Sequence, residues 1–286
     1  MTKRFQAAVQ FALVLLLGFA ASGQSTAAAT LQSATSQAWN AYVAATEARI
    51  DAELRASGKF LTTDFTRDDR VTRDAIARGD IPIGKLTALD RHGNTIDVPD
   101  GLIAHWRGAV FLPGVSLDAL LHRLQHPSER GPHQQDVVSL RVLDRQPDRV
   151  KLAIRMTRTK IVTVTYDTEH AVEYRRAGTA QASSRSVSTK IVEVQNAGTT
   201  GEHALPEGND RGFLWRMNSY WRYEQVNGGV IVELESLTLS RSIPLGLSVI
   251  VEPIIDRIAR ESIHRTLDNM RRTYRGPGVL RAAGGQ

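Results

Sequence analysis

A succession of short strand-like segments, followed by one long helix-like segment, is the feature that most constrains how this chain of 286 residues folds. Residues with strand composition occupy 136–143, 149–156, 161–166, 171–176, 183–194, 213–226 and 230–240. Turn-like residues connect most of them, and Asn227-Gly228-Gly229 is a strong hairpin signal. Strands that are joined this closely pair antiparallel. The sequence therefore predicts a long antiparallel meander.

Apolar residues at helical spacing predict helices before, within and after this region. The last helix is predicted to begin at Pro253, because proline suits a first helical turn. Its apolar face comprises Ile254, Ile255, Ile258, Ala259, Ile263, Leu267 and Met270. A shorter helix over 117–124 has Ser116 as its expected cap. An early helix that ends at Gly58 carries an apolar stripe of Trp39, Tyr42, Val43, Thr46, Ile50 and Leu54. Together these elements predict an α+β fold.

The first 29 residues have the layout of a secretory signal peptide. Lys3 and Arg4 precede an apolar run over 7–21, and small residues follow. This run is shorter than the ~20 residues that a membrane-spanning helix needs, which favours cleavage over anchoring. We therefore expect export to the periplasm or beyond. The chain has no cysteine, which excludes disulfides, thiolate metal ligands and a cysteine nucleophile.

The remaining chain divides into three parts. Residues 30–100 are predicted to form an N-terminal extension, with the early helix and a short hairpin around His92-Gly93-Asn94, packed on the main domain. Residues 101–275 are predicted to form the main domain, and residues 276–286 a disordered tail.

The segment "FLWRMNSYWRYEQV", residues 213–226, carries large apolar side chains in one phase and charged side chains in the other. A strand of an antiparallel sheet commonly has one face toward the core and one toward water. The side chains predicted to face the core, beneath the last helix, are Trp215, Met217, Trp221 and Tyr223. The charges predicted to face outward are Arg216, Arg222 and Glu224, with pairing across strands to acids such as Glu233 or Glu235.

The order strand, helix, meander and long helix over 101–274 resembles the helix-grip fold of the START and Bet v 1-like superfamily, which includes polyketide cyclases. The resemblance rests on "HWRGAVFLPGVSLDALL", "NSYWRYEQVNGGVIVELESLTLSRSIP" and "EPIIDRIARESIHRTL". It implies a curved sheet wrapped around the last helix, with a cavity between them. Members of this superfamily bind sterols, phospholipids, quinones, plant hormones or polyketide intermediates there.

The partner that this resemblance implies is a hydrophobic small molecule or a lipid, held without a covalent mechanism or a cofactor. Aromatic rings supply apolar area, while Ser219 and the Tyr223 hydroxyl would orient one polar group. Arg241 would either meet an anionic head group or form a salt bridge within the fold. The predicted ligand-binding residues are Trp106, Trp215, Met217, Ser219, Trp221, Tyr223, Arg241, Ile254 and Ile258.

Two alternatives stay open. The first is an enzyme of the cyclase or hydrolase kind that uses the same cavity. The second is a structural or interaction module with a filled core, which docks through its N-terminal helix. The sequence contains no G-x-S-x-G, H-E-x-x-H, Walker or dinucleotide motif, which lowers the expectation of an enzyme.

Two polar clusters are interpreted without a chemical role, the first as solvated surface histidines and the second as a turn. His122 and His126 are four residues apart at a helix end, a spacing that could bind zinc, but no carboxylate supports them within the helix, so no metal is predicted. Asp167, Glu169 and His170 in "YDTEH" could serve acid–base chemistry, and they are interpreted as a tight turn between two strands.

The charge distribution predicts no nucleic-acid partner. The net charge of +6 becomes +4 when the signal peptide removes Lys3 and Arg4 (6 − 2 = 4). The remaining arginines are spread along the sequence and form no basic patch within a recognisable nucleic-acid module. A mildly basic chain leaves transient contact with an anionic membrane surface open.

Overall fold

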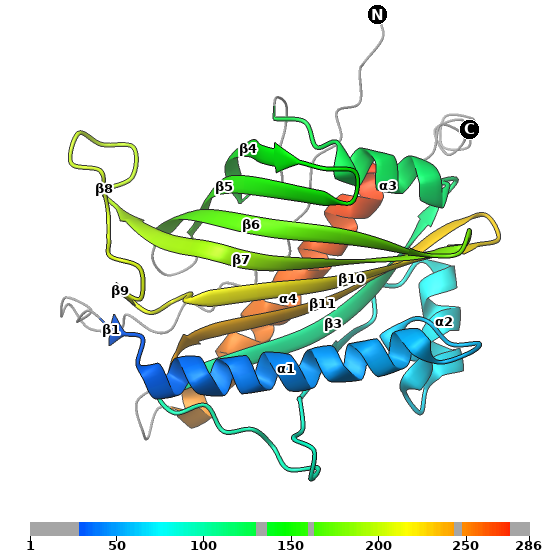
Figure 1. The fold of residues 1–286 in the computed structure, drawn as a ribbon, viewed down its shortest axis with the longest axis horizontal. Helices are drawn as coiled ribbons and strands as arrows, with labels where there is room; N and C mark the ends of the chain where they lie inside the picture. The colour runs from blue at the N-terminus through cyan, green and yellow to red at the C-terminus, as the bar shows by residue number, and fades with distance from the viewer. Residues whose placement is uncertain (1–28, 130–135, 160–162, 243–247, 275–286) are drawn as a thin grey trace, which may run out of the picture.

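The computed structural model describes residues 29–129, 136–159, 163–242 and 248–274, and the side chains of all of these except 248–255 (Figure 1). The predicted signal peptide and C-terminal tail lie outside the described residues. The helices are α1 (Ser33–Arg55), the 3₁₀ turn η1 (Thr62–Phe65), α2 (Asp69–Arg78), α3 (Leu117–Gln125) and α4 (Ser248–Thr273). No helix within the described ranges is both long and apolar enough to cross a membrane.

Nine strands form one antiparallel sheet. Its members are β2 (Ile83–Lys85), β3 (Gly101–Pro113), β4 (Val137–Arg145), β5 (Arg149–Thr159), β6 (Thr163–Ala177), β7 (Gln181–Gln195), β8 (His203–Ala204), β10 (Arg216–Val226) and β11 (Gly229–Arg241). Their spatial order is β2-β3-β11-β10-β7-β6-β5-β4, with β8 paired to β7. A separate ribbon pairs β1 (Ala29–Thr30) with β9 (Asn209–Asp210). The predicted antiparallel meander and the α+β class are confirmed.

The predicted N-terminal hairpin is smaller than the sequence indicated. β2 pairs with β3 of the main domain. The only ladder contact around His92-Gly93-Asn94 in the described chain is a single bridge between Leu89 and Thr95. Asp90 tightens this turn by accepting hydrogen bonds from the backbone amides of residues 92 and 94.

Helices lie on both faces of the sheet: α4 on one face, here called the inner face, and α1 on the other, the outer face (Figure 1). The largest apolar cluster fills the inner face between the strands, α3 and α4. Smaller clusters join the outer face to α1, to the residues just before η1 and to α2. As a result, β11 is buried along both faces from residue 229 to residue 240. The prediction that one face of these strands meets water is therefore wrong.

Ion pairs hold the second half of α1 on the outer face. Arg222 donates to the Glu53 carboxylate at 2.5 Å and to the Phe60 carbonyl at 2.7 Å, although its side chain is only 4% exposed. Arg49 bridges Glu53 and Glu235. Arg222 thus pairs with a helix rather than with an acid on the neighbouring strand, and the cross-strand pairing predicted for it is wrong.

The other charges of this face also bind elements that precede the main domain or loops beside it. Arg216 pairs with Glu207, and Glu224 pairs with Arg73 of α2. Glu233 accepts hydrogen bonds from the amides of Thr62 and Thr63 and thereby holds η1 on the sheet. The N-terminal extension is therefore fastened to the main domain by carboxylates that strand alternation alone assigned to solvent.

Glu235 shows how deeply this ionic layer is buried. Its carboxylate lies 2.7 Å from His105 Nε2, and His105 Nδ1 lies 3.1 Å from the Tyr42 hydroxyl of α1. Burial opposes ionisation of Glu235, yet the hydrogen bond to His105 and the charge of Arg49 hold its pKa at about 2. The carboxylate is thus ionised at any physiological pH.

Two other predictions about element boundaries are wrong. β6 is continuous from Thr163 to Ala177, so "YDTEH" is the middle of a strand and not a turn. Asp167 pairs with Arg155 and Glu169 with Lys151 across the adjacent strand, which explains why these acids tolerate a sheet position. The last helix begins at Ser248, five residues before Pro253.

Gly108 allows α4 to approach the sheet closely. A Cβ atom at this position would lie 2.7 Å from Ile263 Cγ2 and 2.9 Å from Leu267 Cδ1, which is closer than real carbon contacts. We expect Gly108→Ala to destabilise the protein by about 1–3 kcal/mol, because α4 must move outward. Urea unfolding measures this loss, with Gly201→Ala as the control, since nothing approaches that position within 3.7 Å. Equal stabilities for the two variants would contradict this seating of the helix.

Candidate binding site on the inner face

Small hydroxyl side chains line the middle of the inner face beneath α4. The strand register places Trp106, Ser236, Ser219 and Ser186 opposite one another in a single row across β3, β11, β10 and β7. Thr238 lies two residues beyond Ser236 on the same face of β11. All five side chains are at least nine-tenths buried.

Four polar atoms of this group have no hydrogen-bond partner among the described residues. They are Trp106 Nε1, Ser186 Oγ, Ser236 Oγ and Thr238 Oγ1, and none is reached by solvent. Buried polar groups in proteins almost always pair with protein, with ordered water or with a ligand. This row therefore offers two kinds of hydrogen-bonding capacity, because the indole can only donate whereas each hydroxyl can donate or accept.

Large apolar side chains surround the row. Met217, Trp221, Tyr223 and Leu234 belong to the same cluster as Ile263 of α4. The end of the inner face next to α3 is filled by leucines of that helix, namely Leu117, Leu120, Leu121 and Leu124. The hydroxyl row is therefore a polar strip inside an otherwise apolar region.

His170 is the ionisable residue on this face that sequence reasoning assigned to a turn. It is 1% exposed, and its Nε2 lies 3.0 Å from the Thr168 hydroxyl. Burial lowers its pKa to about 3, so the imidazole is neutral at physiological pH. A general base works best with a pKa near the working pH, and a value this low does not suit that role.

Most of the predicted ligand-binding residues lie on the inner face. Tyr223 contacts the Ser184 hydroxyl at 3.0 Å, so its own hydroxyl already has a protein partner. Ile254 lies in α4, and its side chain is outside the described residues. The predicted residues that are buried on the inner face or on α4 are Trp106, Met217, Ser219, Trp221, Tyr223 and Ile258.

Arg241 packs on an aromatic ring at the end of β11. Its guanidinium lies over the Phe213 ring, 5.6 Å from the ring centroid. Its aliphatic stem covers Gly212: a Cβ atom at that position would lie 2.9 Å from the stem, and the φ of 74° would strain any other residue as well. Among the described residues, no acid forms a salt bridge with Arg241.

Trp215 is not on the inner face, and the prediction that it lies beside Met217 is wrong. It packs in the outer cluster with Trp39 and Tyr42 of α1. The reason is local: Trp215 precedes the first residue of β10, and its indole donates to Asp210 Oδ1 at 3.2 Å. This hydrogen bond turns the ring toward the ribbon formed by β1 and β9.

Asp210, the acceptor of this hydrogen bond, makes the stability of the fold dependent on pH. Burial raises the pKa of Asp210 from 3.8 to about 6, against the hydrogen bond from the Gly212 amide. The folded state therefore favours the protonated carboxyl, and the stability that this group contributes is lost as the pH rises through about 6. Asp210→Asn keeps an oxygen acceptor without the charge.

We expect Asp210→Asn to leave stability nearly unchanged at pH 4 and to raise it by roughly 1–3 kcal/mol at pH 8. Urea unfolding of both proteins at the two pH values measures the difference. Asp97→Asn, which removes an exposed carboxylate, is the control and should change little at either pH. Destabilisation by Asp210→Asn at pH 8 would mean that the charged form is the preferred one.

Sequence reasoning missed Ser186, Ser236 and Thr238. The signal was present in "LESLTLSRS", where Ser236, Thr238 and Ser240 alternate with the leucines at 237 and 239. Such alternation usually indicates a solvent-facing side. Here the leucines at 237 and 239 face α1, and the hydroxyls face the interior.

No protein-family model matches the sequence, and no curated protein is significantly similar to it. Solved structures with low overall similarity include human StAR-related lipid transfer protein 5, with 14% identity, 84% of this chain and 97% of that chain covered, and a TM-score of 0.42. A STAR-related lipid transfer protein fragment from Xanthomonas axonopodis has 16% identity, covers 66% and 99% of the two chains, and has a TM-score of 0.39. The ZhuI aromatase/cyclase from Streptomyces sp. R1128 has 13% identity, 65% and 100% coverage, and a TM-score of 0.35.

The position of α4 within the sheet decides the type of fold. Two successive residues of this helix contact strands from opposite ends of the sheet. Ser262 accepts a hydrogen bond from Arg158 of β5 at 3.0 Å, and Ile263 packs against Gly108 of β3. The fold is a helix grip. The inner face of this helix grip carries the hydroxyl row, and its outer face carries the N-terminal extension.

Proposed function

We propose that this protein binds a hydrophobic small molecule or a lipid between the inner face of the sheet and α4, without catalysing a reaction. The observation that supports this function best is the row of buried polar atoms on Trp106, Ser186, Ser236 and Thr238 that lack a partner in the described chain. A purely structural core would place apolar side chains there, since an unpaired buried polar group costs about 1–3 kcal/mol.

The chemistry of the lining favours a ligand with a large apolar body and one or two uncharged polar groups. Apolar surface is stabilised by about 25 cal/mol for each Å² removed from water, and the surrounding aromatic and aliphatic side chains supply that surface. A hydroxyl or carbonyl of the ligand would pair with the hydroxyl row. The low pKa of His170 supports binding over acid–base catalysis in this region.

The first 29 residues have the layout of a signal peptide, so the proposal also includes the cellular location of the protein. We propose that the protein carries its ligand outside the cytoplasm, in the periplasm or beyond. Fractionation of the native host, with immunodetection of the protein, tests location separately from binding.

Binding is tested by native mass spectrometry of protein purified from its own host. We expect a co-purifying mass that organic extraction removes and that a total lipid extract of the host restores. An unmodified protein mass that stays unchanged after incubation with the extract would overturn the proposal.

Thr238→Val separates a ligand-binding hydroxyl from a structural one, because the two side chains have nearly the same shape. In the extracted, ligand-free protein we expect stability to rise by about 1 kcal/mol, since an unpaired buried hydroxyl is removed. In the loaded protein we expect a smaller retained fraction of ligand. Urea unfolding and native mass spectrometry give the two readouts. Undiminished retention of the ligand would show that Thr238 does not contact it.

A further inference from the structure

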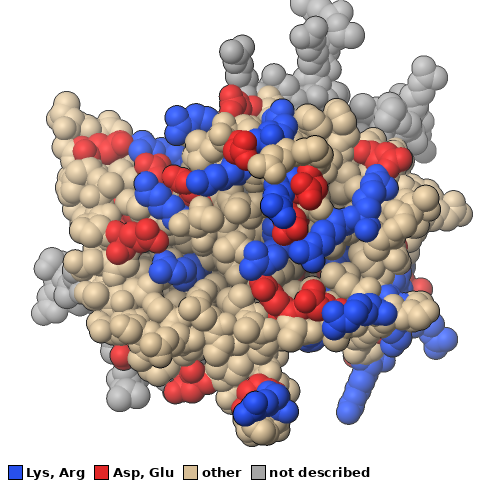
Figure 2. Space-filling model, viewed as in Figure 1, with Lys and Arg blue, Asp and Glu red and all other residues tan. Residues whose placement is uncertain are grey.

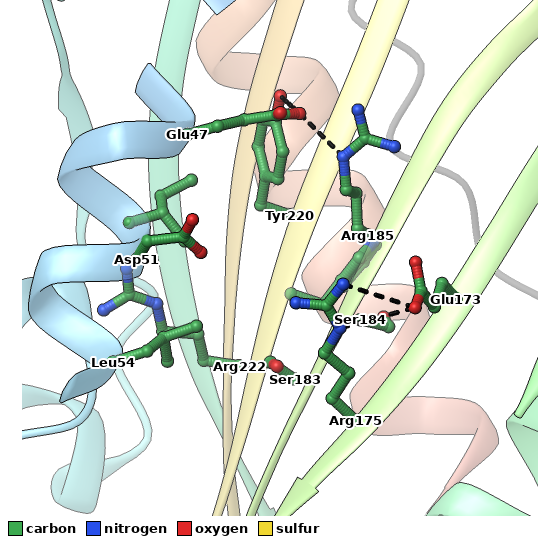
Figure 3. A pocket seen from close by; sticks show the side chains of 12 residues that line it. Glu47, Asp51, Leu54, Glu173, Arg175, Ser183, Ser184, Arg185, Tyr220 and Arg222 are labelled. Atoms are coloured by element: carbon green, nitrogen blue, oxygen red, sulfur yellow. Dashed lines mark hydrogen bonds and ion pairs between the residues drawn. The ribbon is translucent and has the colours of Figure 1, made fainter. Parts of the chain in front are cut away.

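A second pocket lies on the outer face of the sheet, beside α1. Its volume is about 270 Å³, and it is bounded by α1 on one side and by β6, β7 and β10 on the other (Figure 3). It is separated from the hydroxyl row by the sheet itself. The volume is below the ~300–1,000 Å³ that is typical of sites for drug-sized ligands, so its ligand would be small.

The strand register fixes the charges on the floor of this pocket. One row across β10, β7 and β6 contains Tyr220, Arg185 and Glu173. The next row contains Arg222, Ser183 and Arg175. Ser183 therefore lies directly between two arginines. From the other side, α1 contributes the carboxylates of Glu47 and Asp51 together with the apolar side chains of Ile50 and Leu54 (Figure 3).

Some of these charged groups already have good partners. Glu47 accepts hydrogen bonds from Arg185 at 2.7 Å and from the Tyr220 hydroxyl at 2.9 Å. Arg222 is held by Glu53 and the Phe60 carbonyl. These contacts stiffen the pocket and leave its two walls in place without a ligand.

Other groups retain unused capacity on opposite sides of the pocket. Within the described chain, the Asp51 carboxylate on α1 forms no hydrogen bond or ion pair, and the Ser183 hydroxyl on β7 has no hydrogen-bond partner. Arg175 on β6 makes only long contacts of 3.3 and 3.4 Å to Glu173, and its side chain is 67% exposed. An acid therefore faces a guanidinium and a hydroxyl across a small space with an apolar wall.

We propose that this pocket binds a small zwitterion with an apolar side chain, such as a free amino acid or a short peptide. The ammonium group would pair with Asp51, and the carboxylate would pair with Arg175 and Ser183, since guanidinium and hydroxyl groups are good carboxylate donors. The apolar side chain would pack against Ile50 and Leu54. This site is independent of the ligand proposed for the inner face.

Isothermal titration calorimetry of the full protein with L-leucine and with L-leucyl-L-leucine tests the proposal. We expect binding of at least one of them, and at least about a tenfold loss of affinity for its N-acetyl derivative, which lacks the ammonium group, and for its C-terminal amide, which lacks the carboxylate. Absence of heat with both ligands at millimolar concentration would overturn the proposal. Equal affinity for the N-acetyl derivative would also overturn it, because the site would then recognise an anion only.

Two variants test whether the ligand binds in this pocket. Asp51→Asn should weaken binding of the free ligand about tenfold but leave the weaker binding of the N-acetyl derivative unchanged. Arg175→Gln should weaken binding of the free ligand about tenfold but leave the weaker binding of the C-terminal amide unchanged. Arg145→Gln, an exposed arginine on β4 outside the pocket, is the matched control. Thermal unfolding checks that all three variants are folded. Equal loss in the control, or none in the pocket variants, would place the binding elsewhere and refute the proposed site.

Discussion

Replacing Trp221 with alanine is expected to destabilise the protein by about 3–5 kcal/mol. The indole is 5% exposed and lies in the apolar cluster of the inner face, parallel to the Tyr223 ring at a centroid distance of 6.5 Å. Truncation removes its contacts with the cluster and leaves a cavity that the rigid strand cannot close. Urea unfolding of the ligand-free protein measures the loss.

The control for Trp221 is Val138→Ala on the edge strand β4. The Val138 side chain is 59% exposed, so its truncation should change stability by less than about 0.5 kcal/mol. A loss below about 1 kcal/mol for Trp221→Ala would show that its ring does not face the inner cluster. That result would also remove the aromatic wall from the proposed ligand site.

Replacing Arg222 with methionine is expected to cost a similar 3–5 kcal/mol for a different reason. The substitution keeps most of the side-chain volume but leaves the Glu53 carboxylate buried with only Arg49 as a partner. It also leaves the Phe60 carbonyl without its guanidinium donor. Chemical unfolding with circular dichroism detection measures the change in stability.

A double variant distinguishes the cost of an uncompensated charge from the value of the ion pair. Arg222→Met combined with Glu53→Met removes both charges, and replacement of a buried pair by apolar side chains is often nearly neutral. We expect the double variant to recover most of the stability that Arg222→Met alone loses. If the two losses simply add, the charges act independently and the ionic layer is not a coupled unit.

The α+β class, the antiparallel order of the strands and the long terminal helix followed from the sequence because each depends on local signals. Hairpin glycines, alternating strands and helical spacing are properties of neighbouring residues. The apolar side of the segment 217–223 was also predictable, since Met217, Trp221 and Tyr223 share one phase and are all buried on the inner face.

The sequence predicted that the N-terminal extension packs on the main domain, but the face of the sheet that it covers could not be predicted in the same way. The alternating charges at 222, 233 and 235 have the pattern of a strand that faces water, and only the position of α1 makes them buried. The predicted apolar stripe of α1 did not indicate these ion pairs. The residue that α1 buries against the sheet near its C-terminal end is the charged Glu53. Pairing between distant charges leaves no periodic trace in the sequence.

The wrong prediction of a turn within β6 was avoidable. Asp, Thr and Glu at 167–169 are common turn residues, which favoured a break at that point. The unbroken alternation of Val164, Tyr166, Thr168, His170, Val172 and Tyr174 was the stronger signal, and these side chains are all buried. A period of two that continues through turn-forming residues indicates a single strand.

Lysines, arginines and acids are interspersed over the visible outer face rather than separated by sign (Figure 2). Many of them form ion pairs across adjacent strands, such as Lys151 with Glu169 and Arg155 with Asp167. A surface arranged in this way creates no extended positive field.

The ion pairs between α1 and the sheet also imply an order for the folding steps during synthesis. Arg49 and its partner Glu235 are separated by 186 residues, and Arg222 lies 169 residues after Glu53. The helix therefore leaves the ribosome long before its docking surface exists, and its charged and aromatic stripe stays uncovered until the last hairpin has been made. Closure of so long a loop is slow, so we expect the attachment of α1 to be among the final steps of folding.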